Sequence, residues 1–403
     1  MKIRHLAVAA LVTAGGYAGP ATAAVVVNEV LYRPPTELAA DQFIELHNTG
    51  TASVEVTGWR LSGGIDVQLP ATSIPADGYL VVCADPVRFR VAHPSLATLA
   101  GPWSGQLGAG DSLKLHDASG TVVDAVTYAT EGEWATRELG SPDHGFTGWE
   151  WHAGHNGGGR SLELVNPSLP HTLAFNWASS LTSGGTPGAP NSTATVNAAP
   201  LISATGQFPL VPKSTESIFV FARILDEAPA GISAALHWRV DSASPGTFQS
   251  TPMLDDGGHG DGAAGDGLYG AVIPPQPSGT ILEFYLTASD VQGNTRTAPR
   301  VTPAAGRTGN FVTQVDNAPR TNAQPLYRVV MAAVEKAALD AVEGAQPLSD
   351  AASSGTWVTE DGTGTALVYT TAFRNRGHGT RSHSPHNIKV ELPGDQSWQG
   401  RSH

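Results

Sequence analysis

The sequence of 403 residues contains one cysteine and little charge. Cys83 therefore has no partner for an intrachain disulfide. Its position in the apolar stretch GYLVVCAD predicts a small buried side chain rather than a reactive thiol. Charged residues make up only 15% of the chain, whereas glycine and proline are abundant, with 46 and 29 copies. This composition is typical of all-β domains with many turns and argues against helical bundles.

Positively charged residues are fewer than negatively charged ones, with 23 Lys and Arg against 36 Asp and Glu, so the formal net charge is −13. An acidic surface repels phosphate backbones, so we expect no nucleic-acid partner. Beyond the N-terminal region no stretch is long and apolar enough to span a bilayer. The sequence also has no GxSxG elbow, Walker loop, HExxH motif or paired-cysteine zinc motif. We therefore expect no catalysis by this chain and no required cofactor.

Residues 1–24 have the pattern of a secretory signal peptide. Lys2 and Arg4 form a positive start, and a short apolar run from Leu6 to Ala14 follows. Small residues at Ala21 and Ala23 suit cleavage. The pattern predicts an exported protein, secreted or at the cell surface, and the expected partner is an extracellular protein or a polysaccharide.

Residues 25–192 contain seven short stretches in which apolar and polar residues alternate or β-branched residues cluster. Turn-forming clusters of Gly, Pro, Asp and Ser separate them. This spacing is typical of an immunoglobulin-like β-sandwich. The stretches are VVVNEVLY, QFIELHN, SVEVTGWRLS, GYLVVCAD, DSLKLHD, TVVDAVTY and SLELVNP.

The same region resembles the lamin-tail domain family. Eight pieces match in the family's order, and they are VVVNEVLYRPP, DQFIELHNTG, VTGWRL, IPADGYLVV, GDSLKLHDASGTVVDAVTY, GRSLELVNP, NWASS and GTPGAPN. The resemblance implies a compact immunoglobulin-like sandwich that serves as an accessory module. It implies no catalytic residues.

An aromatic and histidine-rich stretch, HGFTGWEWHAGHNGGGR, lies inside this region. His152 and His155 could ligate a metal, but their spacing is loose and no carboxylate-rich partner is evident. The composition favours an exposed aromatic loop. Such a loop could bind sugar or peptide by stacking.

Residues 193–200 are predicted as a linker, after which strands resume. The ending EFYLTASDVQGN, following a strand such as HWRV, resembles bacterial immunoglobulin-like or fibronectin-III-like modules. The resemblance covers about 195–315 and predicts a second β-sandwich without naming a function.

Four aspartates and seven glycines crowd the stretch MLDDGGHGDGAAGDGLYG inside this second module. It contains GxGxxG, but a strand rather than a helix follows, and aspartates would repel phosphate, so we reject a nucleotide site. Two interpretations stay open. Carboxylates and backbone carbonyls could bind calcium, although the spacing differs from that of an EF-hand. The alternative, which we favour, is a connecting turn with aspartate caps. The candidate calcium ligands are Asp255, Asp256, Asp261 and Asp266.

After a second linker at 316–324, the apolar spacing of Val330, Val334, Leu339 and Val342 predicts a strand that leads into an amphipathic helix. Residues 325–403 resemble the N-terminal part of the spore-coat H-type (CotH) kinase family. The matching residues are Pro325 to Met331, Phe373 to Gly377, Thr380 to Ser382 and Asn387 to Val390.

That family has a kinase-like fold that uses ATP and a divalent metal, but its acidic metal ligands lie downstream of the matched part. Lys389 or Arg376 could mark a phosphate-facing position, although neither has a catalytic partner in the sequence. We therefore expect a mainly β chain with two immunoglobulin-like sandwiches in tandem and an incomplete, poorly packed α+β fragment. The expected role is non-catalytic binding or positioning. The alternative is an accessory part of an ATP-dependent kinase.

Overall fold

The computed structural model describes residues 25–96, 98–302, 304, 306–318, 324–342, 349–360, 364–377, 387–396 and 398. The predicted signal peptide therefore lies outside the described residues. The chain forms two compact units. Unit 1 takes its residues from Met1–Tyr128, Gly154–Ala198 and Gly262–Asp266, and unit 2 takes its residues from Ala129–Ala153, Ala199–Asp261 and Gly267–His403.

Unit 1 is a β-sandwich of two main sheets. One sheet has the order β15-β14-β1-β2-β7-β8, the other has the order β11-β10-β4-β5-β9, and β3 pairs with β6. The strands are β1 (Val25–Leu31), β2 (Phe43–Asn48), β3 (Val54–Glu55), β4 (Arg60–Ser62), β5 (Ile65–Gln68), β6 (Ser73–Ile74), β7 (Tyr79–Cys83), β8 (Leu99–Ala100), β9 (Ser104–Gly105), β10 (Asp111–His116), β11 (Val122–Tyr128), β14 (Arg160–Leu164) and β15 (Trp177–Ser183).

The alternating side chains of these strands explain the sandwich. Leu113 and Leu115 on β10 are fully buried, whereas Lys114 between them is exposed. Burying one face of each sheet removes apolar surface from water, which is the main favourable term in folding. A short helix, α1 (Pro86–Ala92), begins at Asp85, whose side chain caps the amides of Val87 and Arg88.

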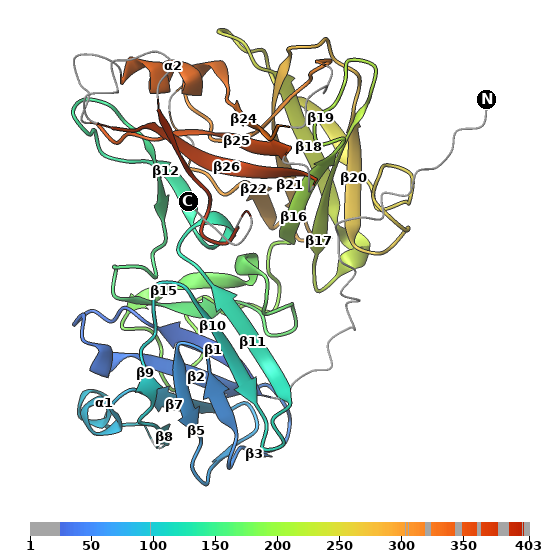
Figure 1. The fold of residues 1–403 in the computed structure, drawn as a ribbon. Coiled ribbons are helices and arrows are strands. Elements are labelled where there is room, and N and C mark those ends of the chain that lie inside the picture. The colour runs from blue at the N-terminus through green and yellow to red at the C-terminus, as the bar shows by residue number, and fades with distance from the viewer. Residues whose placement is uncertain are drawn as a thin grey trace. The chain divides into compact units, whose positions relative to one another are not determined.

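Unit 2 contains the second sandwich, with a three-stranded sheet β16-β17-β20 and a sheet β19-β18-β21-β22 in which β23 also pairs with β21. Figure 1 shows these strands in green to orange. They are β16 (Leu201–Phe208), β17 (Ile218–Leu225), β18 (Ser233–Val240), β19 (Gln249–Met253), β20 (Leu268–Ile273), β21 (Ile281–Ser289), β22 (Thr295–Ala298) and β23 (Phe311–Gln314).

Unit 2 also contains a four-stranded sheet in the order β24-β25-β26-β27, one helix, and a two-stranded hairpin β12-β13. Their bounds are β12 (Thr136–Leu139), β13 (Trp149–His152), β24 (Leu326–Val330), α2 (Ala333–Ala341), β25 (Ser353–Glu360), β26 (Thr365–Asn375) and β27 (Ile388–Glu391). The predicted strand followed by a helix is thus present as β24 and α2. Neither helix in the described ranges has the length and hydropathy that a bilayer span needs.

The prediction that 325–403 would be poorly packed is wrong for its described residues. Tyr369 is buried within the core cluster of the second sandwich, and its ring lies 4.8 Å from that of Phe311. Val330 and Val358 pack with Val312 in a further buried cluster. The α+β segment and the sandwich therefore share one core. Local sequence does not reveal this because the contacts join residues about 20 to 60 positions apart.

Candidate functional site

The aspartate-rich loop between β19 and β20 is a turn stabilised by its own carboxylates. Asp261 is fully buried, and its carboxylate accepts hydrogen bonds from the amides of Asp256, Gly257 and His259 at 2.6, 2.8 and 2.9 Å. Asp255 accepts a hydrogen bond from the amide of Gly267 at 2.9 Å. Carboxylates that cap backbone amides are the pattern that the turn interpretation requires.

The remaining two carboxylates also act within the loop. Asp256 accepts hydrogen bonds from His259 Nδ1 and from the Gly258 amide, and these bonds hold its pKa below the usual range. Asp266 accepts a hydrogen bond from the Ala263 amide. In the described part of the chain, no three His, Cys, Asp or Glu side chains gather as metal ligands would. Calcium binding at this loop stays a prediction.

The histidine- and tryptophan-rich stretch is not the exposed aromatic loop that its composition suggested. Trp149 lies on β13, is 4% exposed, and donates its indole N–H to Glu335 at 2.9 Å. His155 is 2% exposed and bonds through Nδ1 to the Ser179 hydroxyl. His152 is exposed on β13. The stretch is thus buried at Trp149 and His155 and exposed at His152, and the sequence does not indicate the partners of the buried residues because they lie far along the chain.

Cys83 is fully buried on β7, as expected, and burial raises the pKa of its thiol to about 12. A thiol with such a pKa is hardly ionised near neutrality and is a poor nucleophile. The Cys83 side chain therefore fills space in a core cluster with Phe43 and Phe89.

Three buried glutamates in unit 1 were not singled out from the sequence. Glu29, Glu45 and Glu163 lie on the adjacent strands β1, β2 and β14, where Glu29 pairs in register with both of the others, and each is fully buried. Charged residues are almost never fully buried without partners. The sequence pattern that indicates them is a single glutamate inside an apolar strand, as in NEV, FIEL and SLEL.

Donors from residues 185–193 satisfy these glutamates. Thr186 donates its amide N–H to Glu29 at 2.8 Å, and Thr193 donates to Glu163 at 2.9 Å. Burial raises the pKa of Glu29 to about 7 and that of Glu45 to about 8, even though hydrogen bonds oppose the shift. The cluster is enclosed and serves to fasten the segment 185–193 to the sheet.

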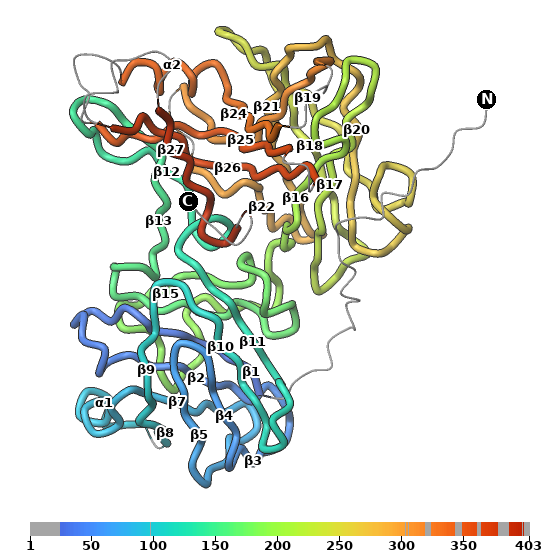
Figure 2. The backbone as a smooth tube through the Cα atoms, viewed as in Figure 1, coloured from blue at the N-terminus to red at the C-terminus, as the bar shows by residue number. Residues whose placement is uncertain are grey.

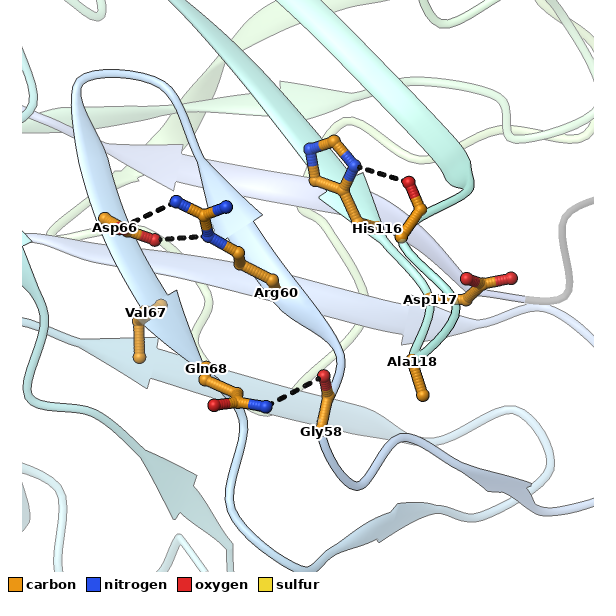
Figure 3. Close-up of a pocket in the computed structure, with 9 residues that line it drawn as sticks. Gly58, Arg60, Asp66, Val67, Gln68, His116, Asp117 and Ala118 are labelled. Carbon is orange, nitrogen blue, oxygen red and sulfur yellow. Dashed lines mark hydrogen bonds and ion pairs between the residues drawn. The ribbon is translucent and has the colours of Figure 1, made fainter.

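An open, polar groove lies on the exposed face of the sheet formed by β4, β5 and β10 (Figure 3). In the strand register, Gln68 faces Arg60 and Arg60 faces His116, so the three side chains form a row on one face. The groove has a volume of about 570 Å³. The lining residues are Gly58, Arg60, Asp66, Val67, Gln68, His116, Asp117, Ala118 and Gly120.

Ion pairs and turn contacts hold the groove side chains in place. Arg60 donates from Nε and Nη2 to the two carboxylate oxygens of Asp66 at 2.7 and 2.8 Å, and this bidentate hydrogen bond lowers the pKa of Asp66. The hydrogen bond from the Ser119 hydroxyl and those from nearby backbone amides lower the pKa of Asp117. The groove thus presents fixed donors and acceptors of both charges.

A hydroxyl–imidazole pair borders this groove, since Ser62 Oγ lies 2.9 Å from His116 Nε2. Hydrolases use such a pair as nucleophile and base, with a third group that orients the base. Here His116 Nδ1 faces the Gly120 carbonyl at 3.3 Å rather than a carboxylate. The neighbouring carboxylate, Asp117, instead caps a turn through the amides of Ser119 and Thr121. The arrangement suits hydrogen bonding to a ligand better than catalysis.

The described basic residues that match the kinase resemblance in 325–403 have partners, and the Arg376 amide donates to the Asn387 carbonyl at 2.7 Å. Lys389 pairs with Glu391 on the same strand. Arg374 pairs with Asp350 at 2.6 Å. Thr380, Arg381 and Ser382 lie outside the described residues.

Comparison with known families identifies both sandwiches. Residues 18–130 match the family model described as Lamin Tail Domain. Residues 222–302 match the model described as the second Ig-like domain of conditioned medium factor. No curated protein matches the sequence. Neither family match reaches residues 325–403, so these matches do not support the kinase resemblance. These two regions are thus similar to a lamin-tail domain and to a second Ig-like domain, and Ig-like families are typically non-enzymatic.

Proposed function

We propose that this protein is an exported, non-catalytic binding protein whose lamin-tail sandwich holds a neutral extracellular polysaccharide in the polar groove. The groove carries the proposal because guanidinium, carboxylate, amide and imidazole groups face the solvent side by side. Such groups donate and accept hydrogen bonds in fixed directions, as a hydroxyl-rich polymer requires.

Charge favours a neutral ligand over an acidic one. Arg60 is neutralised by Asp66, and Asp117 adds a further negative charge. The whole chain has a formal charge of −13. Like charges repel, so an acidic polymer would approach unfavourably.

Affinity gel electrophoresis of the whole chain against a panel of neutral polysaccharides would test the proposal. Arg60→Ala and Gln68→Ala should each weaken binding about fivefold, because each removes a hydrogen-bonding group worth about 1 kcal/mol. Arg90→Ala is a matched control, since Arg90 is exposed on α1 outside the groove. Retardation that both groove variants leave unchanged would refute the groove as the site. Binding to a protein ligand but to none of the polysaccharides would mean that the ligand is a protein.

Export rests on the sequence pattern of residues 1–24. N-terminal sequencing of protein recovered from the culture medium would test it. We expect a mature chain that begins immediately after Ala23 or Ala24. An intact Met1 would contradict export through this segment.

An accessory role in an ATP-dependent kinase is the alternative, and it rests only on the resemblance of residues 325–403. A heat of binding in isothermal titration with magnesium ATP would favour this alternative. The binding-protein proposal expects no heat of binding.

A further inference from the structure

The hairpin of residues 129–153 belongs to unit 2, although the residues on either side of it belong to unit 1. The match to the lamin-tail family ends at residue 130, where this hairpin begins. Thr136 pairs with His152 and Leu139 with Trp149 across its two strands. Figure 2 shows this teal backbone beside the orange and red segments of the same unit. We call residues 129–153 the docking hairpin.

Main-chain hydrogen bonds join the docking hairpin to two other parts of unit 2. Arg137 donates its amide N–H to the Arg300 carbonyl and accepts from the Thr302 amide, both at 2.9 Å. Trp149 donates its amide N–H to the Ala352 carbonyl at 2.8 Å. These bonds attach the hairpin, which is a two-stranded sheet of its own, through an isolated parallel bridge between Arg137 and Val301 and one further main-chain contact. Main-chain hydrogen bonds of this kind give an extended segment affinity that depends little on its side chains.

A buried network then anchors the second strand. Glu335 on α2 is 3% exposed and accepts the Trp149 indole N–H. Arg307 binds both Glu335 oxygens at 2.9 and 2.6 Å, and it also donates to the Thr147 carbonyl at 2.7 Å. Without the hairpin, the buried ion pair would lose the indole that covers it. A buried carboxylate that loses a hydrogen-bond donor is less well satisfied, which costs stability even though Arg307 still pairs with it.

Arg137 anchors the first strand. Its side chain is 1% exposed, donates to the Ser354 hydroxyl at 3.1 Å and to the Thr370 carbonyl, and lies 5.0 Å from the Trp151 ring centroid. Its Nε and Nη2 atoms find no hydrogen-bond partner among the described residues. Burial lowers the pKa of this guanidinium to about 10. Because this charged side chain is almost completely buried, the contact between the hairpin and the rest of unit 2 excludes water at Arg137.

We propose that the docking hairpin is a ligand for a preformed surface of unit 2, and that this contact holds the N-terminal part of the chain even after the linker at 193–200 is cut. The receiving surface consists of residues 300–302, α2 and the start of β25. The partner is a β-hairpin of this chain, recognised by main-chain pairing and a buried tryptophan. The proposal is independent of the polysaccharide groove.

A protease site placed at Val196, which is 92% exposed, tests this in the folded whole chain. After cleavage, the fragments 25–196 and 197–403 should co-elute in native size-exclusion chromatography and separate in denaturant. Trp149→Ala should weaken their association at least 100-fold, because truncating a buried aromatic side chain has effects of that order.

Trp149→Ala could unfold unit 2 as a whole, so a milder double variant is also needed. Glu138→Ala with Asp143→Ala removes hydrogen bonds to the Thr302 hydroxyl and the Asp350 amide at the edge of the contact. It should weaken association about tenfold. The exposed His152→Ala is the control and should change nothing. Fragments that separate in native buffer without any substitution overturn the proposal. Association that withstands the double variant and a folded Trp149→Ala overturns it as well.

Discussion

The buried glutamates of unit 1 predict that its stability falls as the pH rises from 5 to 8. Glu45 has a pKa of about 8 in the folded chain and an ordinary value of 4.5, mainly because of burial. Above pH 4.5 the unfolded chain releases its proton while the folded chain keeps it. Fewer protons are then bound in the unfolded state, so the free energy of unfolding decreases with rising pH.

The size of the effect follows from the shift. One pKa unit corresponds to about 1.4 kcal/mol, so Glu45 alone should account for on the order of 3 kcal/mol between pH 5 and pH 8. Glu29, with a pKa of about 7, adds to the effect in the same direction. For a unit of this size, 1 kcal/mol shifts the melting temperature by roughly 2–4 °C.

Calorimetry of the whole chain and of Glu45→Gln at pH 5, 6, 7 and 8 measures this dependence. The glutamine cannot ionise, so the variant should lose less stability across the range, although it keeps only one of the two oxygens that accept from Asn28 and from the Gly188 amide. Glu37→Gln is the control, because the Glu37 side chain is 74% exposed. Equal pH slopes for the natural chain and for Glu45→Gln would refute the reasoning, as would stability that increases toward pH 8.

Three further outcomes are expected. Asp261→Ala should lower the unfolding free energy of unit 2 by about 1–3 kcal/mol, since it leaves three amides without their acceptor, and thermal melts will measure this. Melts with calcium and with chelator decide the ion hypothesis for the same loop, because only a bound ion gives a difference between them. Burial lowers the pKa of His171, but its hydrogen bond to Asp124, the charge of that carboxylate and the hydrogen bond to the Pro167 carbonyl together outweigh burial, so the net pKa is raised. The stabilisation by this pair is therefore complete below pH 6.5 and is lost as the pH rises through the folded pKa, so His171→Ala should destabilise unit 1 more at pH 5.5 than at pH 8 in urea titrations.

The sequence alone predicts most strands of both sandwiches, because alternation is a local property. On β10, Leu113 and Leu115 have to face one way if Lys114 faces the other, and this holds whatever lies opposite. The turn at Asp261 was predictable for the same reason. Its acceptor and donors lie within five residues, and an aspartate in a glycine-rich stretch caps its own backbone.

When two contact partners lie far apart in the chain, only the tertiary structure shows that they meet. Nothing near Trp149 indicates that its indole meets Glu335, 186 positions away, so the same tryptophan is compatible with an exposed loop or a buried anchor. The groove likewise depends on which strands become neighbours, since Arg60 and His116 come together only when β4 pairs with β10. Side-chain periodicity specifies which face is buried, whereas the pairing of distant strands depends on the packing of the whole core.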